Sequence, residues 1–440
     1  DVTALPSGVS TPAMFVFLYG VIMPLHFGLG KPELAWSAGV AACFIGGFVE
    51  FCGGIIGPWL KKRIPRAALL GTVAGIGFIW MATQGVFDIL GDPMIGLPVL
   101  FVAILGLFGG YMFPKQIPPL VIAIVGGIVY ALCLGRIQPD FSGIGFYIPN
   151  PVNSIEHLID GFAIVAPYLT IIIPVEIYNF IETLDNVEAS NAAGDNYNVR
   201  EAQFADGICT MISAICGGVI PNTVWLGHAG LKKSEAGVGY SLISGIVLGL
   251  SGIFGLFTFL NSVVPPAVCA ITFLWCAVVM VAQAFKDNDR KHYAAIAVAM
   301  VPPVADYLYT QVTGALSLAN LQTAVQNSGL NEYAADVTQM IKDAGVMWNG
   351  VPATKSGAII IGILLGTMVT FVIDKRLDKV GITALMGYIL SCFGFIHSAS
   401  LGFYPLSPFA IGYLIIAVLS FLFHAGRKTW FKGPDDFDYV

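Results

Sequence analysis

Long apolar runs, each long enough to cross a bilayer, are the feature that most restricts the fold of this 440-residue chain. A spanning helix needs about 20 mostly apolar residues. Backbone polar groups in hydrocarbon must find partners inside the protein, which favours helices over irregular chain. Only 11% of the residues are charged, against about 25% in soluble proteins. The sequence therefore predicts an all-α polytopic membrane protein, with apolar segments at 11–29, 34–60, 66–87, 95–112, 117–135, 160–187, 201–219, 236–262, 265–285, 291–313, 356–374, 380–399 and 408–425.

The short connections carry a charge bias that predicts topology. Most lysines and arginines fall on one side when alternate connections are followed from the basic cluster at 61–66. That side is expected to be cytoplasmic, which predicts a multi-pass protein of the cell (inner) membrane with a cytoplasmic tail at 426–440. The eight cysteines occur singly within apolar segments, and nucleotide-binding and zinc motifs are missing from the sequence. We therefore expect no enzyme activity, no cofactor, no metal and no nucleic-acid partner.

The stretch 178–230 holds the most costly residues for a membrane segment. Glu182 and Asp185 are carboxylates near the end of a long apolar run, and acids inside membrane segments are functional by default. A helical repeat of 3.6 residues places them with Asn186 on one face, and we expect Glu176 and Asn179 elsewhere. The alternative is that the carboxylates lie at the cytoplasmic interface. Glu182, Asp185 and Asn186 are candidate substrate-binding residues.

Two short polar elements break apolar runs and are further candidates. In PNTVWLGHAG, we expect Asn222, Thr223, Trp225 and His228 to contact a substrate; an interfacial anchor for Trp225 and a packing role for His228 are the alternatives. In ALPSGVS, Ser7 and Gly8 are expected at the same cavity; a frayed chain end is the alternative.

Ion coupling has its own candidates. They are Asp185, His228 and Asp306, the last of which follows a Pro-Pro break and could equally be structural. Glu50, Glu176 and Asp206 are further acids inside apolar segments. A proton or sodium ion is the expected coupling ion.

The segments 4–15 and 219–230 are similar to each other, because each is a short extended element that runs into a helix. Paired broken elements of this kind are typical of transporters with inverted repeats. The second copy has a full run of helices ahead of it, so we expect about two helices to be missing upstream of Asp1.

FIETLDNVEASNAAG, followed by CGGVIPNTVWLGHAG, resembles the nucleobase–cation symporter (xanthine/uracil permease) family, and most of all its adenine/guanine permease branch. KKRIPRAALLGTVAGIGF and ALPSGVS resemble other helices of that family. The resemblance implies a 7+7 inverted-repeat transporter fold with two short half-strands, and with the first two helices absent from this chain. It implies core-domain helices at 1–60 (half-strand 1–10) and 160–262 (half-strand 219–226). It also implies gate-domain helices at 61–135 and 265–425, the latter with the C-terminal helices.

The function that the resemblance implies is secondary active import of a nucleobase or a related purine- or pyrimidine-like heterocycle. Import is expected to be proton-coupled, by elevator-type alternating access, with a homodimer through the gate domain as one expected assembly. Gly227 and His228 stand where the family has Glu-Asn, which favours a different ligand. Two alternatives remain open. One is a transport-inactive relative that acts as a receptor or as a membrane subunit of a complex. The other is a sulfate-permease-type anion transporter, against which Glu182 and Asp185 count because carboxylates repel anions.

Overall fold

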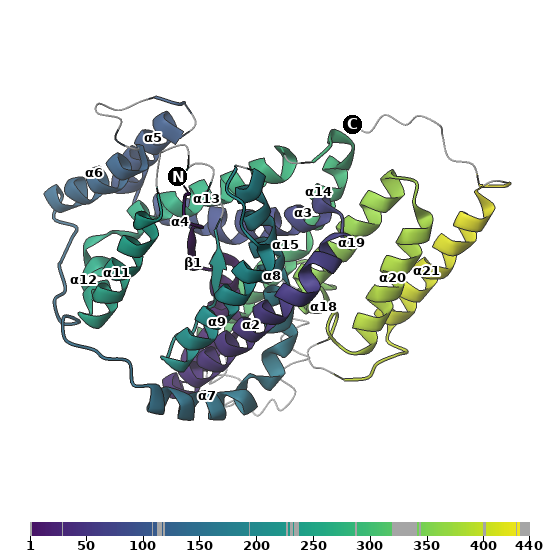
Figure 1. The fold of residues 1–440 in the computed structure, drawn as a ribbon, viewed down its shortest axis with the longest axis horizontal. Helices are drawn as coiled ribbons and strands as arrows, with labels where there is room; N and C mark the ends of the chain where they lie inside the picture. Colours follow the sequence, from purple (N-terminus) through teal and green to yellow (C-terminus); the bar gives the residue numbers. More distant parts are fainter. Residues whose placement is uncertain are drawn as a thin grey trace. The chain divides into compact units, whose positions relative to one another are not determined.

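The computed structural model describes residues 2–28, 30–107, 109–111, 117, 119–192, 194–225, 228, 232, 237–286, 288–318, 341–342, 345–398, 402–427 and 429–431. It consists mainly of helices, and two three-residue strands lie among them (Figure 1). In order, the elements are β1 (Ser7–Val9), α1 (Thr11–Phe17), η1 (Leu18–Ile22), η2 (Pro24–Gly28), α2 (Pro32–Lys61), α3 (Arg66–Ile76), η3 (Gly77–Ala82), α4 (Thr83–Gly91), α5 (Pro93–Leu107), α6 (Pro119–Cys133), α7 (Pro151–Val165), η5 (Ala166–Tyr168), α8 (Leu169–Ala192), α9 (Val199–Ile215), β2 (Asn222–Val224), α11 (Gly239–Ile253), α12 (Leu256–Val263), α13 (Pro266–Lys286), η6 (Arg290–His292), α14 (Tyr293–Ala299), α15 (Pro302–Leu318), α18 (Val351–Lys355), α19 (Ala358–Ile373), α20 (Leu377–Cys392) and α21 (Pro408–Gly426).

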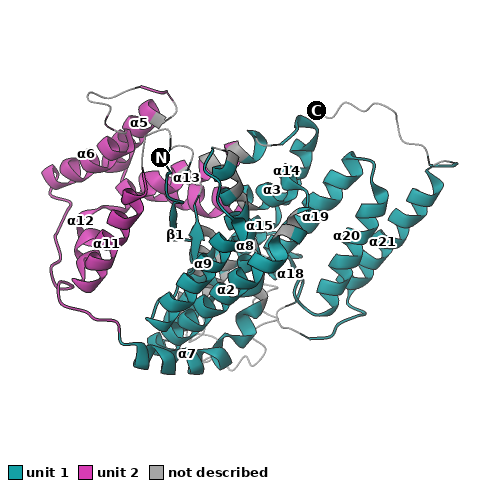
Figure 2. Cartoon of the chain, viewed as in Figure 1, with its two compact units in different colours: residues 1–75, 150–235, 284–440 teal, residues 76–149, 236–283 magenta. Residues whose placement is uncertain are grey.

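The chain forms two compact units (Figure 2). Unit 1 contains Asp1–Gly75, Asn150–Glu235 and Ala284–Val440, and unit 2 contains Ile76–Pro149 and Ala236–Gln283. Both strands belong to unit 1. The division into core and gate domains stays a prediction. Of the expected cytoplasmic tail, residues 428 and 432–440 lie outside the described residues.

Helix α2 packs against α7, α8 and α9 within unit 1, and glycines allow the close approach. A Cβ built on Gly207 would lie 2.7 Å from the backbone oxygen of Gly47, so α2 and α9 meet backbone to backbone. A Cβ on Gly53 would lie 2.5 Å from the Phe180 ring on α8. Small residues that let backbones approach are the usual basis of helix packing in membranes.

Three of the expected continuous segments are broken by proline or glycine. The segment 160–187 is interrupted by the 3-10 turn Ala166–Tyr168, where Pro167 removes a backbone donor. The segment 291–313 is interrupted before Pro302. The segment 236–262 is bent by 97° between α11 and α12 at Gly255, whose φ of 66° lies in the region that glycine favours. In these three places the prediction of one continuous helix was wrong.

The apolar helices also build local cores. In unit 2, α5, α6 and α13 share a cluster of buried aliphatic side chains that includes Val99, Ala123 and Ile271. In unit 1, α19, α20 and α21 share another that includes Leu364, Ala384 and Tyr413.

Three helical spans of the described chain are long and apolar enough to cross a membrane by length and composition, or four if the bent α11–α12 pair is one span. They are Pro32–Gly57, Arg66–Gly91 and Pro408–Gly426. The prediction of a mostly helical chain with several apolar helices, as in a multi-pass membrane protein, is confirmed. The 7+7 arrangement stays a prediction.

Candidate functional site

The two short strands pair with each other and bring together two segments of unit 1 that are more than 200 residues apart in the sequence. They run antiparallel, with Ser7 opposite Val224 and Gly8 opposite Thr223. The flanking prolines extend the ladder through their carbonyls: Pro221 accepts from the Ser10 N–H at 2.9 Å, and Pro6 accepts from the Trp225 N–H at 2.7 Å. The strands are shorter than the expected 1–10 and 219–226, because proline bounds each of them at the side where an N–H would be needed.

Helix α8 holds β2 through Asn179 and the polar residues of the FIETLDN stretch that follows it. The Asn179 amide donates to the Asn222 carbonyl at 3.0 Å, and the Asn186 amide donates to the Val224 carbonyl at 2.6 Å. The hydroxyls of Thr183 and Thr223 lie 3.0 Å apart. Seven residues are nearly two helical turns, so Asn179 and Asn186 lie on the same face, and the expectation that they lie on different faces was wrong. Asn186 and Thr223 are buried and support the strand.

Asn222 is the most connected residue of the strand pair. Its backbone N–H donates to the Thr210 hydroxyl on α9 at 3.0 Å. Its side-chain amide donates to the Ser7 hydroxyl of β1 at 2.6 Å and to Asp206 Oδ1 of α9 at 2.5 Å. The residue therefore links both strands to a buried acid.

Three acids from three helices lie buried beside this network. Glu50 of α2, Glu176 of α8 and Asp206 of α9 are exposed by only 1%, 0% and 4%. Glu50 interacts electrostatically with both other acids and with Glu182. The sequence indicates these acids one by one and does not show that they lie together. The signal that could have found them is that α2, α8 and α9 each carry an acid inside an apolar stretch.

One side of the strand pair is open. Ser7 is exposed, and Val9 and Trp225 are 47% and 43% exposed. The Trp225 indole N–H donates to the Val9 carbonyl at 3.0 Å, which places the ring across β1. A Cβ on Gly8 would lie 3.8 Å from that ring. Ser7, Gly8 and Trp225 therefore form a small surface with a hydroxyl and an aromatic face.

The remaining candidates lie in other surroundings. Glu182 is half-buried on α8, and Asp185 is on the same helix with its side chain outside the described residues. Asp306 is half-buried on α15 and interacts with Lys355, whose ammonium lies 5.0 Å from the Tyr309 ring centre. The roles of these three residues stay predictions.

His228 belongs to a buried cluster that ties down the chain before β1. Its Nε2 lies 3.0 Å from Asp195 Oδ2 and 3.1 Å from the Thr3 carbonyl. Asp195 also accepts from Lys232 Nζ at 2.6 Å and from the Thr3 N–H at 3.1 Å. The hydrogen bond from Lys232 is the main reason that the pKa of Asp195 is lowered. Substrate binding and ion coupling by His228 stay predictions, and its observed contacts are structural.

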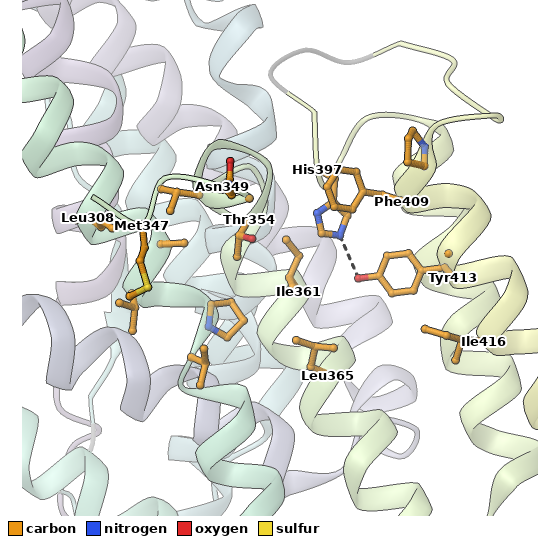
Figure 3. Close-up of a pocket in the computed structure, with 18 residues that line it drawn as sticks. Leu308, Met347, Asn349, Thr354, Ile361, Leu365, His397, Phe409, Tyr413 and Ile416 are labelled. Atoms are coloured by element: carbon orange, nitrogen blue, oxygen red, sulfur yellow. Dashed lines mark hydrogen bonds between the residues drawn. The ribbon is translucent and has the colours of Figure 1, made fainter. Parts of the chain in front are cut away.

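A separate cavity of about 650 Å³ is lined by α15, α18, α19, α21 and the chain at 347–350 (Figure 3). The His397 ring stacks on Phe409 with centres 4.3 Å apart, and its Nε2 lies 3.1 Å from the Tyr413 hydroxyl. Among the described residues that line the cavity, none carries a carboxylate, ammonium or guanidinium group. The cavity suits apolar groups better than a small ion.

No protein-family model matches the chain, and no curated protein sequence matches it. Among solved structures, the chain is similar to the transmembrane domain of a cyanobacterium bicarbonate transporter, BicA. The TM-score is 0.52 at 18% identity, and the match covers 71% of this chain and 85% of that chain.

This likeness overturns the resemblance to nucleobase–cation symporters, because a bicarbonate transporter belongs to a different family. The geometry gives the physical reason. The residues that carried the resemblance, among them Thr183, Asn186 and Thr223, hold the backbone and side chains of β2. Such a motif reports a supported half-strand and does not identify a ligand. The chain therefore has the fold of a membrane transporter domain and not that of an enzyme.

Proposed function

We propose that the chain is a secondary transporter of a small anion, bound at the open face of the β1–β2 pair. The observation that carries this proposal is the likeness of the fold to a bicarbonate transporter's transmembrane domain over 71% of the chain. The sulfate-permease-type reading of the sequence, which was an alternative, thereby replaces nucleobase import.

The open face supports a small ligand. Ser7 offers a hydroxyl donor, and Gly8 has no side chain between β1 and the Trp225 ring. Broken backbone at membrane depth is tolerated where it lines a cavity, and in inverted-repeat transporters such elements form the substrate site.

Glu182 is the residue that argues against an anion, because an ionised carboxylate would repel it. A protonated Glu182 would donate a hydrogen bond in place of that repulsion. The proposal therefore requires that the anion binds together with a positive charge, and a proton is the simplest one. A monovalent anion and one proton would then cross as a neutral pair.

The pairing of the strands supports an inverted repeat as part of the proposal. Two elements related by a two-fold axis between them run in opposite directions, and β1 and β2 pair antiparallel. β1 also leads directly into α1. On this proposal the substrate moves by alternating access around the strand pair, in the cell membrane.

Uptake by liposomes that contain the purified protein tests the proposal. We expect accumulation of bicarbonate, sulfate or a small carboxylate, and a fall in that uptake when Trp225→Ala widens the open face. Adenine and uracil are the comparison ligands, with protein-free liposomes as the blank. Uptake of a nucleobase without uptake of any anion would overturn the proposal.

A further inference from the structure

Three helices deliver one acid each to the same buried interface, and the packing fixes where those acids lie. A Cβ on Gly46 of α2 would lie 2.8 Å from the Glu176 carboxyl carbon, so Glu176 of α8 fits into a notch that only glycine leaves. Glu50 is one turn after Gly46 on α2. Asp206 precedes Gly207, where α9 touches the backbone of α2.

In the described part of the chain, the three acids have no positive partner. Among the described residues, no lysine, arginine or histidine forms an ion pair with Glu50, Glu176 or Asp206. Both oxygens of Glu50, Oε1 of Glu176 and Oδ2 of Asp206 are buried without a hydrogen-bond partner in good geometry, and the Thr183 hydroxyl of α8 is the polar group that interacts with Glu50 and Asp206. Charges this deep are stable only when they are paired or neutralised.

Asn179 adds an independent sign that this site takes a positive ligand. Its amide group donates to the Asn222 carbonyl and lies 3.5 Å from Glu176 Oε2. Its own oxygen, however, is fully buried and has no donor. An amide oxygen and several carboxyl oxygens that all require a donor define a site for a cation or for protons.

We propose that Glu50, Glu176 and Asp206 form the proton-binding site that couples anion movement to a proton gradient. This inference rests on the proposed anion transport and adds the coupling residues to it. Protons fit better than a metal ion, because no group of three or more acid, histidine or cysteine side chains in the described chain could hold a metal. It also moves the coupling function away from Asp185, His228 and Asp306.

The acids are connected by hydrogen bonds to the open face of the β1–β2 pair, where the anion is proposed to bind. Asp206 accepts from the Asn222 amide, and that amide also donates to Ser7 on the open strand face. In the proposed cycle, a carboxylate of the site takes up one proton on the side from which the anion enters. It becomes a carboxylic acid, and it returns to a carboxylate by releasing the proton on the other side. No other bond is made or broken.

The other titratable groups around the site are few. Glu182 of α8 interacts with Glu50, and the Cys43 thiol of α2 interacts with Glu176. His157 of α7 contacts α2 far from the site, where its ring nitrogen lies 2.8 Å from the Ser37 hydroxyl. Single substitutions of Glu182, Cys43 and His157 can therefore show whether a change in the pH dependence of transport comes from the three acids or from these groups.

The test uses liposomes that contain the full chain, with an inward proton gradient. Wild-type protein is expected to accumulate the anion against its gradient and to exchange anion across the membrane without a proton gradient. Glu176→Gln should lose the gradient-driven accumulation and keep the exchange. Asp206→Asn should also lose the accumulation, and it is expected to alter the exchange because Asp206 accepts from the Asn222 amide that also donates to Ser7. Glu156→Gln, which removes an exposed carboxyl group on α7, is the matched control and should behave like the wild type.

The outcomes separate the two proposals. Variants that keep full gradient-driven accumulation would overturn the site, and so would accumulation driven by sodium and not by protons. If the wild type transports no anion, the proposed function fails. The site is then tested by the carbonyl stretch of protonated carboxylic acids in infrared difference spectra between low and high pH. That signal should be lost in part in each single variant, and a signal unchanged in both variants would refute the site. Gel filtration and melting curves identify a variant that does not fold. If Glu176→Gln or Asp206→Asn does not fold, Glu50→Gln is used in its place.

Discussion

The side-chain amide of Asn222 lies 2.5 Å from Asp206 Oδ1, and this hydrogen bond joins strand β2 to a buried acid on α9. The same amide reaches Ser7 of β1 at 2.6 Å. One side chain thus connects the open face of the strand pair with the acids beneath it. A change at Asp206 that moves the Asn222 amide therefore also changes the hydrogen bond to Ser7 at the open face.

Asn222→Ala is expected to destabilise the protein. It removes the donors to Ser7 and Asp206 and leaves the backbone bond to Thr210 in place. Leaving a buried acceptor such as Asp206 unsatisfied costs about 1–3 kcal/mol. A lower midpoint of unfolding in detergent measures the effect. Asn153→Ala changes an exposed asparagine of α7 and should leave the midpoint unchanged; equal effects of both substitutions would contradict the network.

Gly207→Ala is expected to separate α2 from α9. The added Cβ would lie 2.7 Å from the Gly47 oxygen and 2.7 Å from the Phe51 nitrogen. Both atoms belong to the backbone and cannot rotate away, so an overpacking cost of about 1–3 kcal/mol is expected. Thermal unfolding is the measurement.

Gly245→Ala is the matched control for that prediction. Gly245 lies in α11, and a Cβ there meets no heavy atom within 4 Å. Alanine is the better helix former, so the control should be neutral or slightly stabilising. A Gly207→Ala protein as stable as the control would show that α2 and α9 are not in backbone contact.

The positions of the two strands could be predicted from the sequence, and their pairing could not. Pro6 and Pro221 interrupt apolar runs beside small polar residues, which marks extended chain at each place. Which strand pairs with which, and in what register, depends on the path of the chain between residues 9 and 222. No local pattern records that path.

The interpretation of the FIETLDN motif failed for a physical reason. A side chain that supports a half-strand and a side chain that binds a ligand are of the same polar types and occur at the same helical spacing. Only the structure shows that Asn186 donates to the Val224 carbonyl. The sequence does not show that the three acids lie together, for a related reason. The rotation of each helix is set by glycine contacts with its neighbour, such as Gly46 with Glu176, and the periodicity of one helix does not give the rotation of the next.

The cluster around Asp195 predicts a pH-dependent stability. The hydrogen bond from Lys232 lowers the pKa of Asp195 in the folded protein, whereas in the unfolded chain it is near its ordinary value of about 3.9. Below that value the unfolded state binds more protons, so the stabilisation is complete at higher pH and is lost as pH falls through the folded pKa. The melting temperature should therefore fall with acidification more steeply in wild type than in Asp195→Asn.

Lys232→Met separates this effect from general acid unfolding. It removes the main hydrogen bond that lowers the pKa of Asp195. The pH at which wild type and variant converge should then mark the titration of Asp195. A difference between wild type and Asp195→Asn that stays constant from neutral to acid pH would contradict this account.

Gly8→Ala separates anion binding from folding at the strand pair. The added Cβ would lie 3.8 Å from the Trp225 ring, which is an ordinary contact, so the melting temperature should not change. The methyl group would nevertheless cover the backbone where the anion is proposed to bind. A loss of about 1.4 kcal/mol in binding would lower the affinity tenfold, and quenching of Trp225 fluorescence by the anion can measure it. Gly252→Ala places a Cβ at a similar distance, 3.9 Å, from the Phe257 ring and should leave the affinity unchanged. If Gly8→Ala binds the anion as well as the wild type does, the anion seat is not at the β1–β2 pair.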